Sequence, residues 1–231
     1  MIPLKNLRTC ATFPAVTLAI ILVNFLVFFY QISLPERALE PFIMTYALVP
    51  ARVQLALSGS HFTLMRAFAP FFTSMFLHAG WLHILGNMWF LWLFGGNVED
   101  RLGHLPYLGF YMLCGLGAGV AQTLFSLGST IPSLGASGAI AGVLGAYVVF
   151  FPSSKILTLV TLFIWWFFAR LPAVLFIGLW FLIQFLSGIS SLGSAASGGV
   201  AWWAHVGGFL LGMLLVSGMK RRQPDYDYSS S

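Results

Sequence analysis

The sequence contains very little charge, since Asp, Glu, Lys and Arg together make up 7% of its 231 residues. Soluble domains carry about 25% charged residues, so a chain this poor in charge lacks the polar surface that a water-soluble protein needs. Hydrophobic residues make up 59%, and the mean hydropathy is +0.90. We therefore predict an integral membrane protein, with no room for a large soluble domain beside several membrane spans.

The chain has few acidic residues and only two cysteines, and their positions argue against two kinds of structure. No Asp or Glu occurs between Asp100 and Asp225, which argues against a Ser-His-Asp triad in the later part of the chain. The two cysteines, Cys10 and Cys114, lie before the first apolar run and inside a later one, so a disulfide framework is not expected. No H-E-x-x-H motif is present, and no carboxylate lies near His83 or His205 in the sequence, so neither a metal nor another cofactor is predicted.

Long apolar runs predict an all-α polytopic membrane protein with six transmembrane helices. Residues 34–80 mix charged, proline and aromatic residues, so we expect this first outer loop to lie at the membrane interface as short amphipathic pieces. Residues 156–169 are too few to cross, and Arg170 and Pro172 interrupt them, so an interfacial or re-entrant piece is expected there. The predicted spans are 14–33, 81–102, 107–127, 135–151, 171–188 and 200–219.

Six spans place both termini on one side, and the basic residues indicate that this side is cytoplasmic. Arg37, Arg52 and Arg66 alone would remain outside. The predicted organisation is a cytoplasmic tail over 1–13, a six-helix membrane domain over 14–219, and a second cytoplasmic tail over 220–231. The basic residues are scattered in loops and tails, so the net charge of +5 does not indicate nucleic-acid binding. The residues assigned to the cytoplasmic face are Lys5, Arg8, Arg101, Lys155, Arg170 and those at 220–222.

Among the polar residues within predicted spans, where polar groups are costly and therefore functional candidates, four stand out. They are His83 and Asn87 in the second span, Ser137 in the fourth and His205 in the sixth. All three helices enter from the outer side, and each residue lies within about two turns of that end, so the four can meet at one depth. Ser137 stands among glycines at a predicted helix start, which offers room and free N–H groups for a nucleophile. Alternatively, Ser137 is a helix N-cap and the glycines only permit close packing.

The spacing of small residues suggests how the fourth and sixth spans meet. Gly138 and Gly142 on one helix match Gly208 and Gly212 on the other, and close contact between these faces would bring His205 beside Ser137. A Ser-His dyad is therefore the chemistry that the residues permit.

The second span carries a further polar pair. His83 and Asn87 are four residues apart and share a helix face, where their donors suit an oxyanion; the alternative is a polar pair that holds helices together. His78 is expected to organise the loop before this span.

With these residues identified, the chain resembles the rhomboid family of intramembrane serine proteases. The resemblance rests on Gly135-Ala136-Ser137-Gly138, on Ala204-His205-Val206-Gly207-Gly208 with Gly212, on His83 to Asn87, and on the stretch Gly95 to Gly103. It implies a six-helix core with Ser137 as nucleophile and His205 as base, in a cavity open to the outside. It also implies that His83 and Asn87 stabilise the oxyanion, and that Arg66, Glu99 and Arg101 have structural roles.

The same resemblance implies substrates that are single-pass or membrane-anchored proteins, cleaved near the outer end of their transmembrane segment. We expect the protein in a bacterial or archaeal plasma membrane. Many relatives carry an aromatic residue four positions after the serine, where this chain has Ala141, so another group, such as an aromatic side chain from another helix, must hold the imidazole. Two alternatives stay open: an inactive rhomboid-like protein that binds membrane clients, and a small transporter or channel. The sequence leaves the natural substrate and the oligomeric state open.

Overall fold

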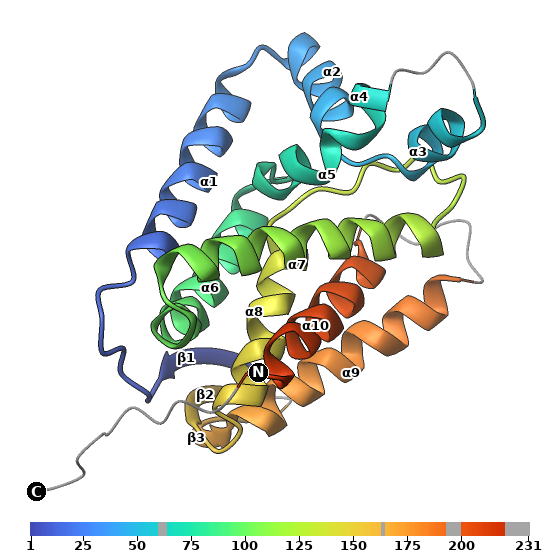
Figure 1. Ribbon diagram of the computed structural model, residues 1–231. Coiled ribbons are helices and arrows are strands. Elements are labelled where there is room, and N and C mark those ends of the chain that lie inside the picture. Colours follow the sequence, from blue (N-terminus) through green and yellow to red (C-terminus); the bar gives the residue numbers. More distant parts are fainter. Residues whose placement is uncertain (60–63, 163–164, 193–199, 220–231) are drawn as a thin grey trace, which may run out of the picture.

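The fold is known from a computed structural model, which describes residues 1–59, 64–162, 165–192 and 200–219. Helices dominate it, and they follow the expected order closely (Figure 1). The long helices are α1 (Ala15–Ser33), α6 (Trp81–Leu102), α7 (His104–Phe125), α8 (Ser137–Phe150), α9 (Ala173–Ser191) and α10 (Trp202–Ser217). Each coincides with one of the predicted spans to within a few residues.

Helix α8 lies at the centre of the bundle and packs on α6, α7 and α10. Its sequence is apolar all round, which is typical of a helix without a solvent-facing side. Most of its residues are buried, from Gly138 through Tyr147. The chain leaves α8 through Pro152, which cannot continue a helix, and α9 begins directly after Pro172.

Residues 36–76, which the sequence analysis assigned to the first outer loop, fold into short helices at one end of the molecule (Figure 1). None of them is long enough to cross a membrane. They are α2 (Glu36–Tyr46), α3 (Pro50–Leu57), α4 (Leu64–Phe68), α5 (Pro70–Thr73) and the 3-10 turn η1 (Ser74–Phe76).

A three-stranded antiparallel sheet at the opposite end corrects the expectation of an all-α fold (Figure 1). Strands β2 (Lys155–Leu162) and β3 (Trp165–Pro172) form a hairpin from the stretch predicted to be an interfacial or re-entrant piece. Strand β1 (Ile2–Asn6), in the expected N-terminal tail, pairs with β2. β-branched and aromatic residues favour strands, but both faces of this hairpin are apolar, so the alternation that identifies a strand is absent.

Within the described residues, three helices are long and apolar enough to cross a membrane: α1, α7 and α9. A fourth candidate is the pair formed by Leu64–Phe76 and α6, which bends by 76°. Helices α8 and α10 are apolar but shorter. The protein is therefore a mostly helical membrane protein, and the count of six spans stays a prediction.

Candidate active site

Ser137 and His205 are in direct contact. Ser137 is the first residue of α8 and follows a turn in which Gly135 has a φ of +127°, a conformation that favours glycine. His205 lies in the first turns of α10, and its Nε2 is 2.8 Å from Oγ of Ser137. This is hydrogen-bond distance, and it is the arrangement in which an imidazole can remove the hydroxyl proton.

The contact depends on an unusually close approach of α8 and α10. A Cβ added to Gly208 would lie 2.0 Å from the carbonyl oxygen of Gly138, and one added to Gly212 would lie 2.1 Å from that of Gly142. The obstacles are backbone atoms, which cannot rotate away as a side chain can. The matched glycines named from the sequence therefore face one another, and only glycine fits at 208 and 212.

Gln184 is a site residue that the sequence analysis missed. It lies on α9, is 8% exposed, and its Oε1 is 2.7 Å from Nδ1 of His205. A neutral imidazole carries one N–H, so an acceptor at Nδ1 leaves Nε2 unprotonated and free to accept the serine proton. The signal was available: Gln184 is a polar residue in an otherwise apolar span, the criterion that identified the other four.

Aromatic rings also surround the imidazole, although Ala141 cannot supply one. The ring of Trp180, on α9, lies 5.9 Å from that of His205, and the ring of Trp202 lies 6.4 Å away, edge-on. An aromatic group from another helix was one of the expected substitutes. Here α9 contributes both the ring of Trp180 and Oε1 of Gln184, which accepts the hydrogen bond from His205.

His83 and Asn87 lie beside the turn that leads into Ser137. A methyl group at Gly135 would be 2.8 Å from Nε2 of His83 and 3.6 Å from Nδ2 of Asn87. Asn87 Nδ2 is also 3.0 Å from Nε2 of the fully buried His78. An amide has two N–H groups, so one can be held by His78 while the other remains for a ligand.

His78 connects this pair to α1. Its backbone carbonyl accepts a bond from Gln31 Nε2 at 2.6 Å, and its backbone N–H donates to Gln31 Oε1 at 3.2 Å. Its position after η1 agrees with the expected role of organising the loop before α6.

A small pocket adjoins Ser137 between α7 and the start of α8. Small residues form much of its wall, among them Gly115, Ala118 and Gly119 on α7. No three His, Cys, Asp or Glu residues in the described part of the chain lie close enough together to hold a metal ion.

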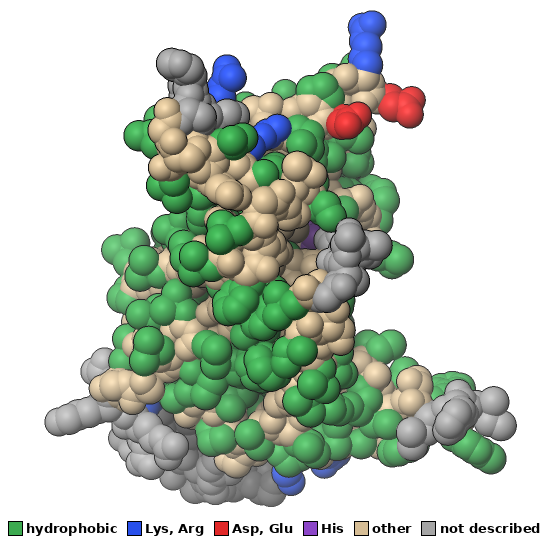
Figure 2. All heavy atoms as spheres, turned by 90° about the vertical axis from the view of Figure 1, so that its right-hand side faces the viewer, with side chains coloured by type: hydrophobic (Ala, Val, Ile, Leu, Met, Phe, Trp, Pro, Cys, Tyr) green, Lys and Arg blue, Asp and Glu red, His purple; other side chains and the backbone are tan. Residues whose placement is uncertain are grey.

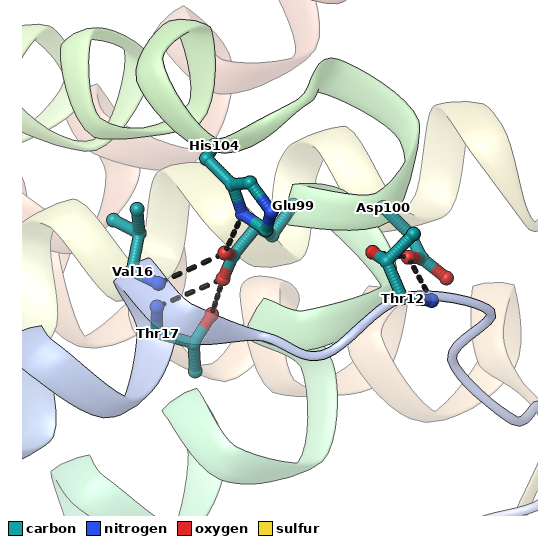
Figure 3. Close-up of polar contacts among 6 residues, drawn as sticks. All are labelled: Thr12, Val16, Thr17, Glu99, Asp100 and His104. Carbon is teal, nitrogen blue, oxygen red and sulfur yellow. Dashed lines mark hydrogen bonds and ion pairs between the residues drawn. The ribbon is translucent and has the colours of Figure 1, made fainter.

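Glu99 and Asp100, near the end of α6, hold the start of α1 and the segment before it (Figure 3). Glu99 accepts bonds from the backbone N–H groups of Val16 and Thr17 at 2.9 and 2.8 Å, and lies 2.5 Å from His104 Nδ1. A carboxylate at a helix N-terminus satisfies free N–H groups and complements the helix dipole. Asp100 accepts the backbone N–H of Thr12 at 2.8 Å.

The two arginines expected to be structural lie in different places. The Arg101 guanidinium lies 5.6 Å from the centre of the Phe150 ring, which connects the ends of α6 and α8. Arg66 is exposed on α4.

Comparison with known proteins decides the family. Residues 61–222 match the Rhomboid domain, which is more than half of the chain. The chain belongs to the rhomboid family. The resemblance identified from the sequence motifs is thereby confirmed.

Relatives of this rhomboid come from several eukaryotes. It is 33% identical over 144 residues to RHOMBOID-like protein 1 of Arabidopsis thaliana, covering 62% of this chain and 32% of the relative. It is 34% identical over 154 residues to Rhomboid protein 1, mitochondrial, of Saccharomyces cerevisiae, covering 61% and 39%. The presenilin-associated rhomboid-like protein, mitochondrial, of Bos taurus is 35% identical over 94 residues, covering 38% and 24%. The rhomboid thus spans well under half the length of these relatives.

Proposed function

We propose that this rhomboid is an intramembrane serine endopeptidase that uses a Ser137–His205 dyad. The observation that carries the proposal is the hydrogen-bonded series Gln184, His205 and Ser137, with both distances below 3 Å. A nucleophile, a base and a group that orients the base are the three parts such chemistry requires. Family membership supports the same reading.

In the proposed reaction, Ser137 Oγ attacks the carbonyl carbon of the scissile peptide bond while His205 Nε2 takes the hydroxyl proton. The tetrahedral oxyanion receives hydrogen bonds from Asn87, His83 and the backbone N–H of Ser137. His205 then gives its proton to the leaving nitrogen, and the C–N bond breaks. Water hydrolyses the resulting acyl ester by the same steps, which regenerates Ser137.

The substrates we propose are single-pass or membrane-anchored proteins, cut near the outer end of their transmembrane segment. The small residues around the pocket beside Ser137 suit a substrate residue with a small side chain. We retain six spans, the membrane domain over 14–219, and the tails over 1–13 and 220–231 on the cytoplasmic side, with the site opening to the outside. A bacterial or archaeal plasma membrane stays a prediction, because the named relatives are eukaryotic.

A fluorophosphonate probe applied to the protein in membranes tests this function directly. Such a probe reacts with a serine whose hydroxyl has been activated by a base, so we expect one labelled site, at Ser137. Absence of labelling in folded protein would favour the alternative, an inactive rhomboid-like protein that binds membrane clients.

Removing the Gln184 acceptor is expected to lower kcat. Gln184→Leu keeps the volume but leaves the Nδ1–H of His205 buried without a partner, which costs about 1–3 kcal/mol, equivalent to a roughly 5- to 150-fold loss. Turnover per probe-labelled site separates this effect from loss of folded protein. Gln184→Glu retains an acceptor at the same position and should retain more activity than the leucine variant. Equal kcat in wild type and Gln184→Leu would refute the orienting role.

Removing the Asn87 amide is expected to lower kcat more than it raises KM. An oxyanion donor acts mainly in the transition state, and loss of one typically costs about 2.7–4 kcal/mol, or roughly 10²–10³ in rate. Asn24→Ala is the matched control, because Asn24 is also buried but its amide donates to Ile20 in its own helix. If Asn87→Ala leaves kcat per labelled site unchanged, Asn87 only packs helices.

A further inference from the structure

Residues 165–168, at the start of β3, are apolar on both faces and exposed, and we call them the tip of the β2–β3 hairpin. Trp165, Trp166, Phe167 and Phe168 are consecutive in β3 and are 73%, 71%, 49% and 63% exposed. Successive strand residues point to opposite faces, so large aromatic side chains stand on both sides of the ribbon. A ribbon that exposes aromatic rings on both faces is unsuited to water.

The other half of the hairpin is firmly held by the protein. Strand β1 pairs with β2 only from Ile156 to Leu159, so the tip extends beyond the three-stranded part. Ile156 and Thr158 are fully buried, and the Trp89 indole donates to the carbonyl of Pro3 in β1 at 2.7 Å. The hairpin is therefore a fixed projection with an apolar end.

Basic and aromatic residues follow one another along one face of this projection. Directly opposed residues of antiparallel strands share a face, and the register pairs Leu157 with Arg170 and Leu159 with Phe168. Lys155 and Arg170, both exposed, thus lie at the root, with Phe168 and Trp166 beyond them. Arg170 and Trp166 are separated by about 13 Å at roughly 3.3 Å per residue.

This length exceeds the polar layer of a bilayer, which is about 5–8 Å thick on each side, so a ribbon with Arg170 at the headgroups can place Trp166 just beneath them. Aromatic residues favour this region, and cations at the root can bind lipid phosphates. Within the described residues, β3 is an edge strand of the sheet, so some of its backbone groups have no sheet partner. Such groups are too costly for the hydrocarbon centre of a bilayer but are tolerated where water reaches them. Among the described residues, Glu99 and Asp100 are the acidic residues at this end, and they already hold the start of α1 and the segment before it.

We propose that the β2–β3 hairpin is a membrane-interface anchor that binds anionic phospholipid. Its aromatic tip inserts beneath the headgroups, and Lys155 and Arg170 bind the headgroup phosphates. The hairpin follows the C-terminal end of α8, so it lies a helix length of about 20 Å from Ser137 and is separate from the site. In Figure 2, Lys and Arg side chains appear at both the upper and the lower end of the molecule, whereas the Asp and Glu side chains in view lie at the upper end.

Fluorescence quenching by brominated lipids tests this anchor in the full chain, reconstituted in vesicles. The tryptophan fluorescence of the tip is obtained by subtracting the fluorescence of the Trp165→Phe/Trp166→Phe variant from that of wild type. This variant keeps the tip aromatic. We expect strong quenching of this signal by brominated phosphatidylglycerol, at least twofold stronger than by the same fraction of brominated phosphatidylcholine. In Lys155→Gln/Arg170→Gln the quenching should persist while the twofold preference disappears.

The control is the same subtraction with Trp81→Phe, which reports an exposed tryptophan at the start of α6. Its quenching should not respond to the Lys155 and Arg170 substitutions. Absence of quenching at the tip would place it in water, or against a second copy paired along β3, and would overturn the proposal. Equal quenching by both lipids in wild type would overturn the binding of anionic lipid.

Discussion

Replacing Ser137 with alanine is expected to abolish cleavage of a single-pass reporter protein while leaving the protein folded in the membrane. Ser137 Oγ is the only protein atom that bonds to the substrate carbonyl carbon in the proposed reaction, so its loss removes both the formation and the hydrolysis of the acyl ester. Loss of the serine from a serine protease lowers kcat by on the order of 10⁶, which is below detection in a reporter assay. The measurement is cleavage by purified protein in vesicles.

Ser217→Ala is a matched control for this experiment. Ser217 is the last residue of α10, and its exposed hydroxyl donates to the carbonyl of Leu214 in the same helix at 2.9 Å. The substitution therefore also removes a serine Oγ, but one that has no contact with the site. The control should cleave at the wild-type rate. Cleavage by Ser137→Ala above one hundredth of that rate would refute the assignment of the nucleophile.

Adding one methyl group at Gly208 or Gly212 is expected to disable the enzyme without removing any chemical group. Gly208→Ala places a Cβ 2.0 Å from a backbone oxygen of α8, so the two helices must separate. A misplacement of about 1 Å between reacting groups can cost about 10²-fold in rate, and overpacking costs about 1–3 kcal/mol of stability. Cleavage rate, probe labelling and thermal unfolding together measure both effects.

Gly178→Ala provides the comparison, because nothing lies within 4 Å of a Cβ added at that position of α9. There the substitution should be neutral or slightly stabilising, since alanine favours helix over glycine by about 1 kcal/mol. If Gly208→Ala and Gly178→Ala match wild type in both stability and cleavage, close packing of α8 and α10 does not position the dyad.

The helices and most of the candidate site could be predicted because each leaves a local signal. Long apolar runs in the sequence are bounded by Pro, Gly or charged residues. Helices α1, α6 and α7 begin and end close to these bounding residues. A polar residue in an apolar helix is costly wherever the helix packs, so Ser137, His205, His83 and Asn87 were visible without knowledge of their partners.

The hairpin could not be predicted in the same way. Strands depend on hydrogen bonds to other segments, and β1 pairs with β2 across about 150 residues of chain, a relation that no local pattern contains. Both faces of residues 165–168 are apolar, so the period of two that indicates a strand is missing, and a short apolar run of this kind is equally consistent with helix.

The sequence by itself determined that this is a membrane protein, where its long helices lie, and that it carries a serine and a histidine suited to catalysis. Only the tertiary structure decided what holds the histidine. Gln184 lies 21 residues before His205 on another helix, and its Oε1 reaches Nδ1 only because α9 packs beside α10. A hydrogen bond requires a specific distance and direction, and helix packing sets both, whereas residue type and spacing set only which groups are present.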